Sequence, residues 1–159
     1  MKRTACAVLA VTGLYLCWLG MMAVHEAGHV LHARASGGVV DRVSVPLAGF
    51  SQTFYSVNPR PHFVAWGGAV WGCVAPLMML GLASRGPRQL RGAIQFFAGF
   101  CLLVNGVYLG VGWTTRAGDA GDLLEHGTPV WVLMTFGAVA SAGGLYLWHL
   151  LGTRGSAST

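Results

Sequence analysis

Residues 25 to 29 of the chain read His-Glu-Ala-Gly-His, a HExxH pattern whose residue types can do chemistry together. Two histidines four positions apart on a helix lie about 40° apart around the axis and roughly 6 Å apart along it, so both imidazoles can bind one metal ion. Glu26, at the neighbouring position, can take a proton from a water bound to that metal. The pattern is typical of two zinc ligands, His25 and His29, and the general base of a metalloprotease.

The alternative interpretation of these residues is structural, with two core histidines beside a buried acid. Residues 1 to 24 are almost devoid of charge, and an ionisable trio beside lipid is costly unless it has a function. We therefore favour a metal site. His32 continues the same helix face, but seven residues of helix rise about 10 Å, too far for His25 and His32 to share one tetrahedral zinc.

A catalytic zinc usually takes three protein ligands and a water, so the two histidines leave one ligand to be found. Acidic residues are scarce, since the whole chain has only five. Asp119 and Asp122, just before the last apolar segment, are the two candidates. Asp122 could instead cap the helix that follows, a common role for aspartate before an apolar run. Glu125 and His126 would then lie in the first turn of that helix, where either could support the site by hydrogen bonding.

The elements that must position these side chains are those of a membrane protein. Hydrophobic residues make up 54% of the 159 residues and charged residues 9%, whereas soluble domains carry about 25% charged residues. The net charge is +5, but the basic residues are scattered without interleaved aromatics, so nucleic-acid binding is not supported. We expect a multi-pass integral protein of the cell (plasma) membrane, surrounded by the lipid bilayer.

Four apolar stretches are long enough to cross a bilayer as helices. The first includes the HExxH pattern and is stopped by Gly37 and Gly38. Two Gly-xxx-Gly pairs, which begin at Gly68 and Gly106, would let transmembrane helices approach closely. The chain is predicted to be a single all-α membrane domain with a frayed tail at 152–159 and with transmembrane helices at about 5–35, 62–83, 92–113 and 129–151.

The segment between the first two spans has a different pattern. From residue 39 to residue 57, hydrophobic and polar residues alternate in two runs, with Pro46 and Gly49 between the runs. This pattern predicts a short membrane-associated β-hairpin, at the membrane surface or dipping into it. An irregular interfacial loop is the alternative.

The HExxH pattern near the end of the first apolar helix, followed by Arg34, Gly37 and the hairpin pattern, resembles the site-2 protease family of intramembrane zinc metalloproteases. The third zinc ligand of that family is an aspartate in a motif similar to Asn…Leu-Asp-Gly-Gly. On that pattern Asp119 is the third ligand, and Asn105 stands near the family's asparagine as a supporting residue. The chain is similar to a divergent, minimal member, because it lacks the prolines after the asparagine, has Ala120 in place of the first glycine and has no substrate-sorting domain.

The resemblance implies a protease that uses Zn2+ to hydrolyse a peptide bond in or near a transmembrane segment of a membrane-protein substrate. Glu26 would be the catalytic residue, and the resemblance favours Asp119 over Asp122 as the third ligand. The hairpin could pair with an unwound substrate segment, because backbone groups in lipid need hydrogen-bond partners. Two other functions stay open: a catalytically silent membrane scaffold of the same fold, and a metal transporter whose intramembrane histidines and aspartates line an ion path.

Two arguments about the orientation in the membrane disagree. Six basic residues fall on the side of the N-terminus and four on the side of the motif, which favours a cytoplasmic N-terminus. The resemblance implies instead that the motif lies near the cytoplasm. From the sequence we favour the resemblance, because a difference of two charges is a weak bias.

Overall fold

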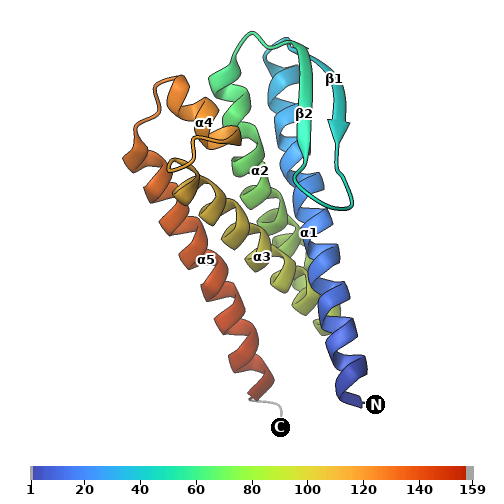
Figure 1. The fold of residues 1–159 in the computed structure, drawn as a ribbon. Helices are drawn as coiled ribbons and strands as arrows, with labels where there is room; N and C mark the ends of the chain where they lie inside the picture. The colour runs from blue at the N-terminus through green and yellow to red at the C-terminus, as the bar shows by residue number, and fades with distance from the viewer. Residues whose placement is uncertain (1, 157–159) are drawn as a thin grey trace.

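The computed structural model describes residues 2–156, which fold into a bundle of long helices with a small sheet beside it (Figure 1). The elements in chain order are α1 (Lys2–Ala35), β1 (Val39–Ser44), β2 (Gln52–Val57), α2 (Pro61–Leu82), the short 3-10 helix η1 (Ala83–Arg85), α3 (Arg88–Gly112), α4 (Gly118–Glu125) and α5 (Val130–Ser156). Both ends of the chain lie at one end of the bundle, and the hairpin and α4 lie toward the other (Figure 1).

Four helices are long and apolar enough to cross a membrane, namely Arg3–Ala35, Pro61–Arg85, Arg88–Gly112 and Val130–Thr153. They differ from the expected spans by no more than four residues at any end. The segment predicted as a frayed tail begins at residue 152, and α5 continues through its first part to Ser156. Within this extension the hydroxyl of Thr153 donates a hydrogen bond to the carbonyl of Leu150. Residues 157–159, also assigned to the tail, lie outside the described residues.

The residues before α5 form a helix of their own, α4, instead of the first turn of the last span. Asp122 lies inside α4, eight positions before α5 begins, so the prediction that it caps the last helix is wrong. Glu125 and His126 lie at the C-terminal end of α4. Gly127 has φ +89, a conformation that favours glycine, and a proline follows at position 129. These two residues end α4 and separate it from α5.

The long helices pack in sequence, α1 against α2, α2 against α3, and α3 against α5. Two of these contacts require glycine. A Cβ on Gly28 of α1 would lie 2.2 Å from the carbonyl oxygen of Gly67 of α2. A Cβ on Gly137 of α5 would lie 2.4 Å from the Cα of Gly110 of α3. The second Gly-xxx-Gly pair, Gly106 and Gly110, therefore lies at the contact between α3 and α5.

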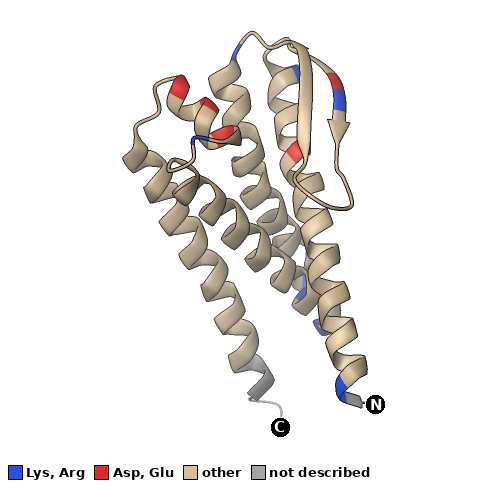
Figure 2. Ribbon diagram, in the orientation of Figure 1, with Lys and Arg blue, Asp and Glu red and all other residues tan. Residues whose placement is uncertain are grey.

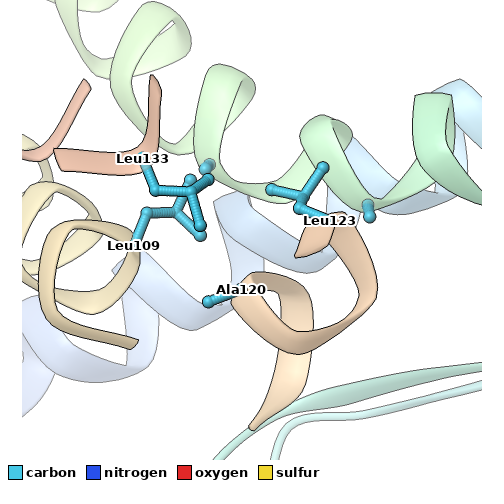
Figure 3. Packing of buried hydrophobic residues seen from close by; sticks show 6 residues of the cluster. Leu109, Ala120, Leu123 and Leu133 are labelled. Carbon is cyan, nitrogen blue, oxygen red and sulfur yellow. The ribbon is translucent and has the colours of Figure 1, made fainter. Parts of the chain in front are cut away.

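A buried hydrophobic cluster fastens α4 to the bundle (Figure 3). The cluster is made by α2, α3, α4 and α5 and consists of Ala65, Ala69, Leu109, Ala120, Leu123 and Leu133. An isolated helix as short as α4 is not stable in water, so these contacts decide where it lies. Because Ala120 and Leu123 are fully buried, the preceding residue, Asp119, is held in place as well.

The two strands form the predicted antiparallel hairpin, and its loop lies along α1 (Figure 1). The hydroxyl of Tyr15 donates a 2.8 Å hydrogen bond to the carbonyl of Leu47, and the rings of Trp18 and Phe50 meet edge to face with their centroids 5.9 Å apart. The loop side chains of Leu47 and Phe50 are exposed by 74% and 79%. Exposed apolar side chains beside the apolar part of α1 suit a hairpin that dips into lipid.

Charged residues gather toward the two ends of the bundle (Figure 2). All five acidic residues of the chain lie toward the end that carries α4 and the hairpin. At the other end, the charged side chains that the structure describes are all basic, and they belong to Arg3, Arg85, Arg88 and Arg91. The helices between these ends carry no charge, as a hydrocarbon environment requires.

Candidate metal centre

Three potential ligand atoms from distant parts of the chain converge at one point. The Nε2 atoms of His25 and His29 lie 3.2 Å apart. Oδ2 of Asp119 lies 2.9 Å from Nε2 of His25 and 3.2 Å from Nε2 of His29. The histidines are one turn apart on α1, and α4 brings the carboxylate from 94 positions further along the chain. The structure thus places Asp119 beside the two histidines.

The hydrogen-bond partners of Nδ1 in His25 and His29 determine which ring nitrogen of each histidine carries the proton. Nδ1 of His29 is 2.8 Å from the carbonyl oxygen of Val64, which can only accept, so Nδ1 donates. Nδ1 of His25 is 2.7 Å from Oδ1 of Asn105. The amide nitrogen of Asn105 donates to the carbonyl of Cys101, which leaves Oδ1 as the acceptor for His25. In the neutral imidazoles, each Nε2 therefore carries a lone pair.

Two imidazole lone pairs and a carboxylate oxygen repel one another at this distance unless a cation lies among them or an imidazole is protonated. Metal-binding histidines characteristically donate the far ring N–H to a carbonyl or carboxylate, as both do here. Zinc holds N and O ligands at 2.0–2.2 Å, so tetrahedral ligand atoms lie about 3.3 Å apart. The observed separations of 2.9 and 3.2 Å need to widen only slightly, and the residues therefore fit a zinc ion.

Two glycines of α2 leave room for this centre. A Cβ on Gly68 would lie 2.4 Å from Nε2 of both His25 and His29. A Cβ on Gly72 would lie 2.6 Å from the amide nitrogen of Asn105. A larger residue at either position must therefore displace an imidazole or the amide that orients it. The Gly-xxx-Gly pair that predicts a close helix contact thus also forms a wall of the metal centre.

The backbone around Asp119 fixes the carboxylate at the centre. The N–H of Asp119 donates a 3.0 Å hydrogen bond to the hydroxyl oxygen of Tyr108. Gly118 permits this approach, because it has φ +56 and a Cβ there would lie 2.1 Å from that oxygen. Burial favours a raised pKa for the carboxyl of Asp119. Where His25 and His29 are protonated and donate from Nε2, their hydrogen bonds and positive charges outweigh burial and hold this pKa well below its usual value. A cation held by the neutral imidazoles would favour the ionised carboxylate in the same way, as a metal ligand requires.

The other candidate residues of this region stay outside the centre. Asp122 is exposed at the wall of the adjacent cavity and is not bonded to either histidine. Partial burial and the negative charge of Asp119 raise its pKa. Glu125 and His126 are exposed, and Nδ1 of His126 donates to the backbone carbonyl of Asp122. Glu125 and His126 do not contact the metal ligands, so the structure shows no hydrogen bond through which either would support the site.

His32 also lies apart from the centre, as the helix geometry predicts. Its Nδ1 donates to the carbonyl of Phe63 at 2.7 Å, and its Nε2 accepts from Nε1 of Trp71 at 3.2 Å. The imidazole also stacks on the ring of Phe63. Both nitrogens of His32 are thus occupied by contacts that join α1 to α2.

Glu26 lies beside the centre and has a partner that the sequence did not indicate. Its side chain is almost completely buried, and a carboxylate oxygen lies within 4.8 Å of a ring nitrogen of both His25 and His29. The hydroxyl of Thr53 on β2 donates a hydrogen bond to Oε2 of Glu26. The alternation along β2 places Thr53 among the polar residues of the hairpin. In the structure this polar position is buried, because it faces the acid on α1.

A cavity of about 840 Å³ opens beside these residues. Its walls come from α1, β2, α2, α3, α4 and adjoining loops. The part toward the hairpin loop is apolar and includes Trp18, Met21, Met22, Phe50, Leu103 and Val104. The part toward α4 is more polar and includes Asn58, Thr115 and Asp122. Volumes of this size accommodate a small-molecule ligand or a short peptide segment.

In comparisons with known proteins, no family model, curated protein or solved structure matches this chain. The resemblance to site-2 proteases therefore rests on the residues of the chain alone. A function must be argued from the geometry and chemistry of the site.

Proposed function

We propose that the protein is an intramembrane zinc metalloprotease of the cell membrane, resembling the site-2 proteases. Its substrate would be a membrane protein, cleaved in or near a transmembrane segment. The observation that carries the proposal is the convergence of Nε2 of His25, Nε2 of His29 and Oδ2 of Asp119, with the buried carboxylate of Glu26 beside them. Three protein ligands and a nearby acid are the donor set of a hydrolytic zinc site.

Each residue then has a defined task. His25, His29 and Asp119 would hold the ion beside the cavity that all three line. Bound zinc would lower the pKa of a coordinated water from about 16 to about 7 and would polarise the substrate carbonyl. Glu26 would take the proton from that water and pass it to the leaving amine. Asn105 would keep the imidazole of His25 in the ligating tautomer through its hydrogen bond to Nδ1.

The substrate helix must unwind locally before the reaction, because the peptide groups of a helix are hydrogen-bonded to one another. An unpaired backbone group in lipid costs several kcal/mol, so the unwound segment needs new partners. Gln52, Thr53 and Tyr55 of β2 line the cavity, so this strand can pair with the segment by strand addition. The apolar wall toward the hairpin loop suits side chains that arrive from lipid.

The two other functions fit the site less well. A catalytically silent scaffold has no need of an acid buried beside two histidines, yet Glu26 is 3% exposed. A metal transporter needs ionisable groups along a path through several spans. In this chain all acidic residues lie toward one end of the bundle.

Replacing Glu26 with glutamine tests the proposal. The amide has nearly the same shape but cannot take a proton, so cleavage should fall about 10²–10⁴-fold. The probe is a panel of epitope-tagged single-span membrane proteins reconstituted with the purified protein in liposomes. Glu26→Gln should retain zinc in elemental analysis, whereas the control His25→Ala should lose both zinc and cleavage. Undiminished cleavage by Glu26→Gln would contradict the mechanism, and a wild type that binds no zinc would contradict the metal centre.

A further inference from the structure

We infer that Thr53 is a positioning residue for Glu26, and that through it the hairpin holds the general base in its working orientation. This inference rests on the proposed function and adds a residue that no sequence pattern indicates. It starts from one contact between elements that are far apart in the chain, the hydrogen bond from Thr53 on β2 to Glu26 on α1.

The contact is buried and has a defined direction. The side chains of Thr53 and Glu26 are 8% and 3% exposed. A carboxylate can only accept, so the hydroxyl of Thr53 donates to Oε2. A hydrogen bond from a hydroxyl to an ionised carboxylate is charge-assisted, and such bonds are about twice as strong as neutral ones. The bond takes one of the lone pairs of Oε2, so Oε1 is the less engaged oxygen and the better placed to receive a proton.

A glutamate base needs such a restraint. The terminal torsion of a glutamate side chain is broad, so an unsupported carboxylate samples many orientations. A misplacement of about 1 Å at a reacting group can cost roughly 10²-fold in rate. Thr53 is a stiff support, because its β-branched side chain has few rotamers and its backbone pairs with Val43 in the hairpin.

The same hairpin is anchored to α1 at a second place. Its loop is held by the hydrogen bond from Tyr15 to Leu47 and by the contact between Trp18 and Phe50. Thr53 supplies the anchor beside the metal centre. Because β2 also lines the cavity, one strand both meets the substrate and orients the base. The placement of Glu26 therefore depends on the hairpin as well as on its own helix.

Thr53→Val tests the inference, because valine keeps the shape and removes the hydroxyl. With the reporter panel, kcat should fall about 10- to 100-fold, while KM stays within about twofold and zinc occupancy is unchanged. Thr53→Ser, which keeps the donor, should restore most of kcat. Ser56→Ala is the matched control on the same strand, since the hydroxyl of Ser56 is bonded to exposed Asp41 instead. It should leave all three quantities unchanged.

Two results would overturn the role of Thr53. One is a Thr53→Val protein with wild-type kcat, and the other is a loss that appears only in KM or in zinc content. A measurement independent of cleavage is the thermal midpoint of Thr53→Val, Glu26→Ala and the double variant, whose effects should not add if the side chains are paired. Additive effects would exclude the pairing. A wild type that cleaves no reporter would instead contradict the proposed function, even if the pair is coupled.

Discussion

At the metal centre, the decisive hydrogen bonds lie on the far side of each imidazole. The carbonyl of Val64 and the amide oxygen of Asn105 each accept a hydrogen bond from an Nδ1 atom, so both Nε2 lone pairs turn toward Asp119. Asn105 is 80 positions from His25 and is itself held by the carbonyl of Cys101. The HExxH pattern thus provides the two histidine ligands, and residues outside it decide which ring nitrogen of each histidine carries the proton.

The third ligand can be tested by comparing two aspartates on the same short helix. Asp119→Ala removes an oxygen that lies 2.9 Å from Nε2 of His25, so bound zinc should fall by at least about tenfold. Asp122→Ala removes an exposed carboxylate and should leave zinc in place. Elemental analysis of both purified variants measures this. Zinc retained in Asp119→Ala and lost in Asp122→Ala would move the third ligand to Asp122.

The sequence could indicate these ligands only in part. His25, Glu26 and His29 follow from the motif spacing alone, because a helix puts residues four apart on one face. The choice between Asp119 and Asp122 depends on which face of α4 turns toward the bundle, and tertiary packing decides this. Thr53 was missed because an alternating pattern separates two faces of a strand but does not tell what each face meets.

At the scale of elements, α2 shapes the centre without contributing a ligand side chain. Val64, Gly68 and Gly72 are spaced by four residues, so they lie along one face of the helix. The carbonyl of Val64 accepts a hydrogen bond from Nδ1 of His29. Gly68 makes room for both imidazoles and Gly72 for Asn105. This face of α2 acts as a template against which α1 and α3 assemble the site.

Gly68→Ala tests this role of α2. The added methyl group would lie 2.4 Å from both Nε2 atoms, so the variant should lose zinc and about 1–3 kcal/mol of stability through overpacking. Gly81→Ala is the control on the same helix, since nothing lies within 4 Å of a Cβ there. It should keep both zinc and thermal midpoint. A Gly68→Ala protein with wild-type zinc content would contradict the close fit of α2 against the histidines.

The long elements were predictable because their causes are local. A bilayer requires about twenty apolar residues per helix, and the chain shows four such stretches. The end of α1 was predictable too, since Gly37 adopts φ +80 and Gly38 donates to the carbonyl of Ala33, a glycine-dependent helix ending. Helix α4 was not predicted because a helix of eight residues depends on tertiary contacts rather than on its own propensity.

For the whole molecule, the placement of charge separates the two ends. Every acidic residue lies toward the end with the metal centre (Figure 2). The basic residues at or near the other end are Lys2, Arg3, Arg85, Arg88, Arg91 and Arg154, and those toward the metal-centre end are Arg34, Arg42, Arg60 and Arg116. One end of the bundle is therefore basic without neighbouring acids. The metal centre lies toward the end that carries charges of both signs.

This distribution leads to a prediction about the orientation in the membrane. Basic residues near the ends of spans favour the cytoplasmic side, and each one near an anionic lipid surface gains about 1 kcal/mol. Since six of the ten basic residues lie toward the end with the termini, the charges favour that end in the cytoplasm and the metal centre near the opposite face. The resemblance to site-2 proteases predicts the reverse, and we keep that expectation because a difference of two charges is a weak bias.

Cysteine labelling distinguishes the two orientations. The four native cysteines are free and would first be replaced, after which a single cysteine is introduced at Ser84 or at Ser56. Both serines are exposed, and they lie at opposite ends of the bundle, Ser84 in η1 and Ser56 in β2. A membrane-impermeant maleimide added to intact cells should label the cysteine at position 84 and reach position 56 only after lysis. Labelling of position 56 alone in intact cells would show that the excess of basic residues decides the topology, and that the metal centre lies near the outer face.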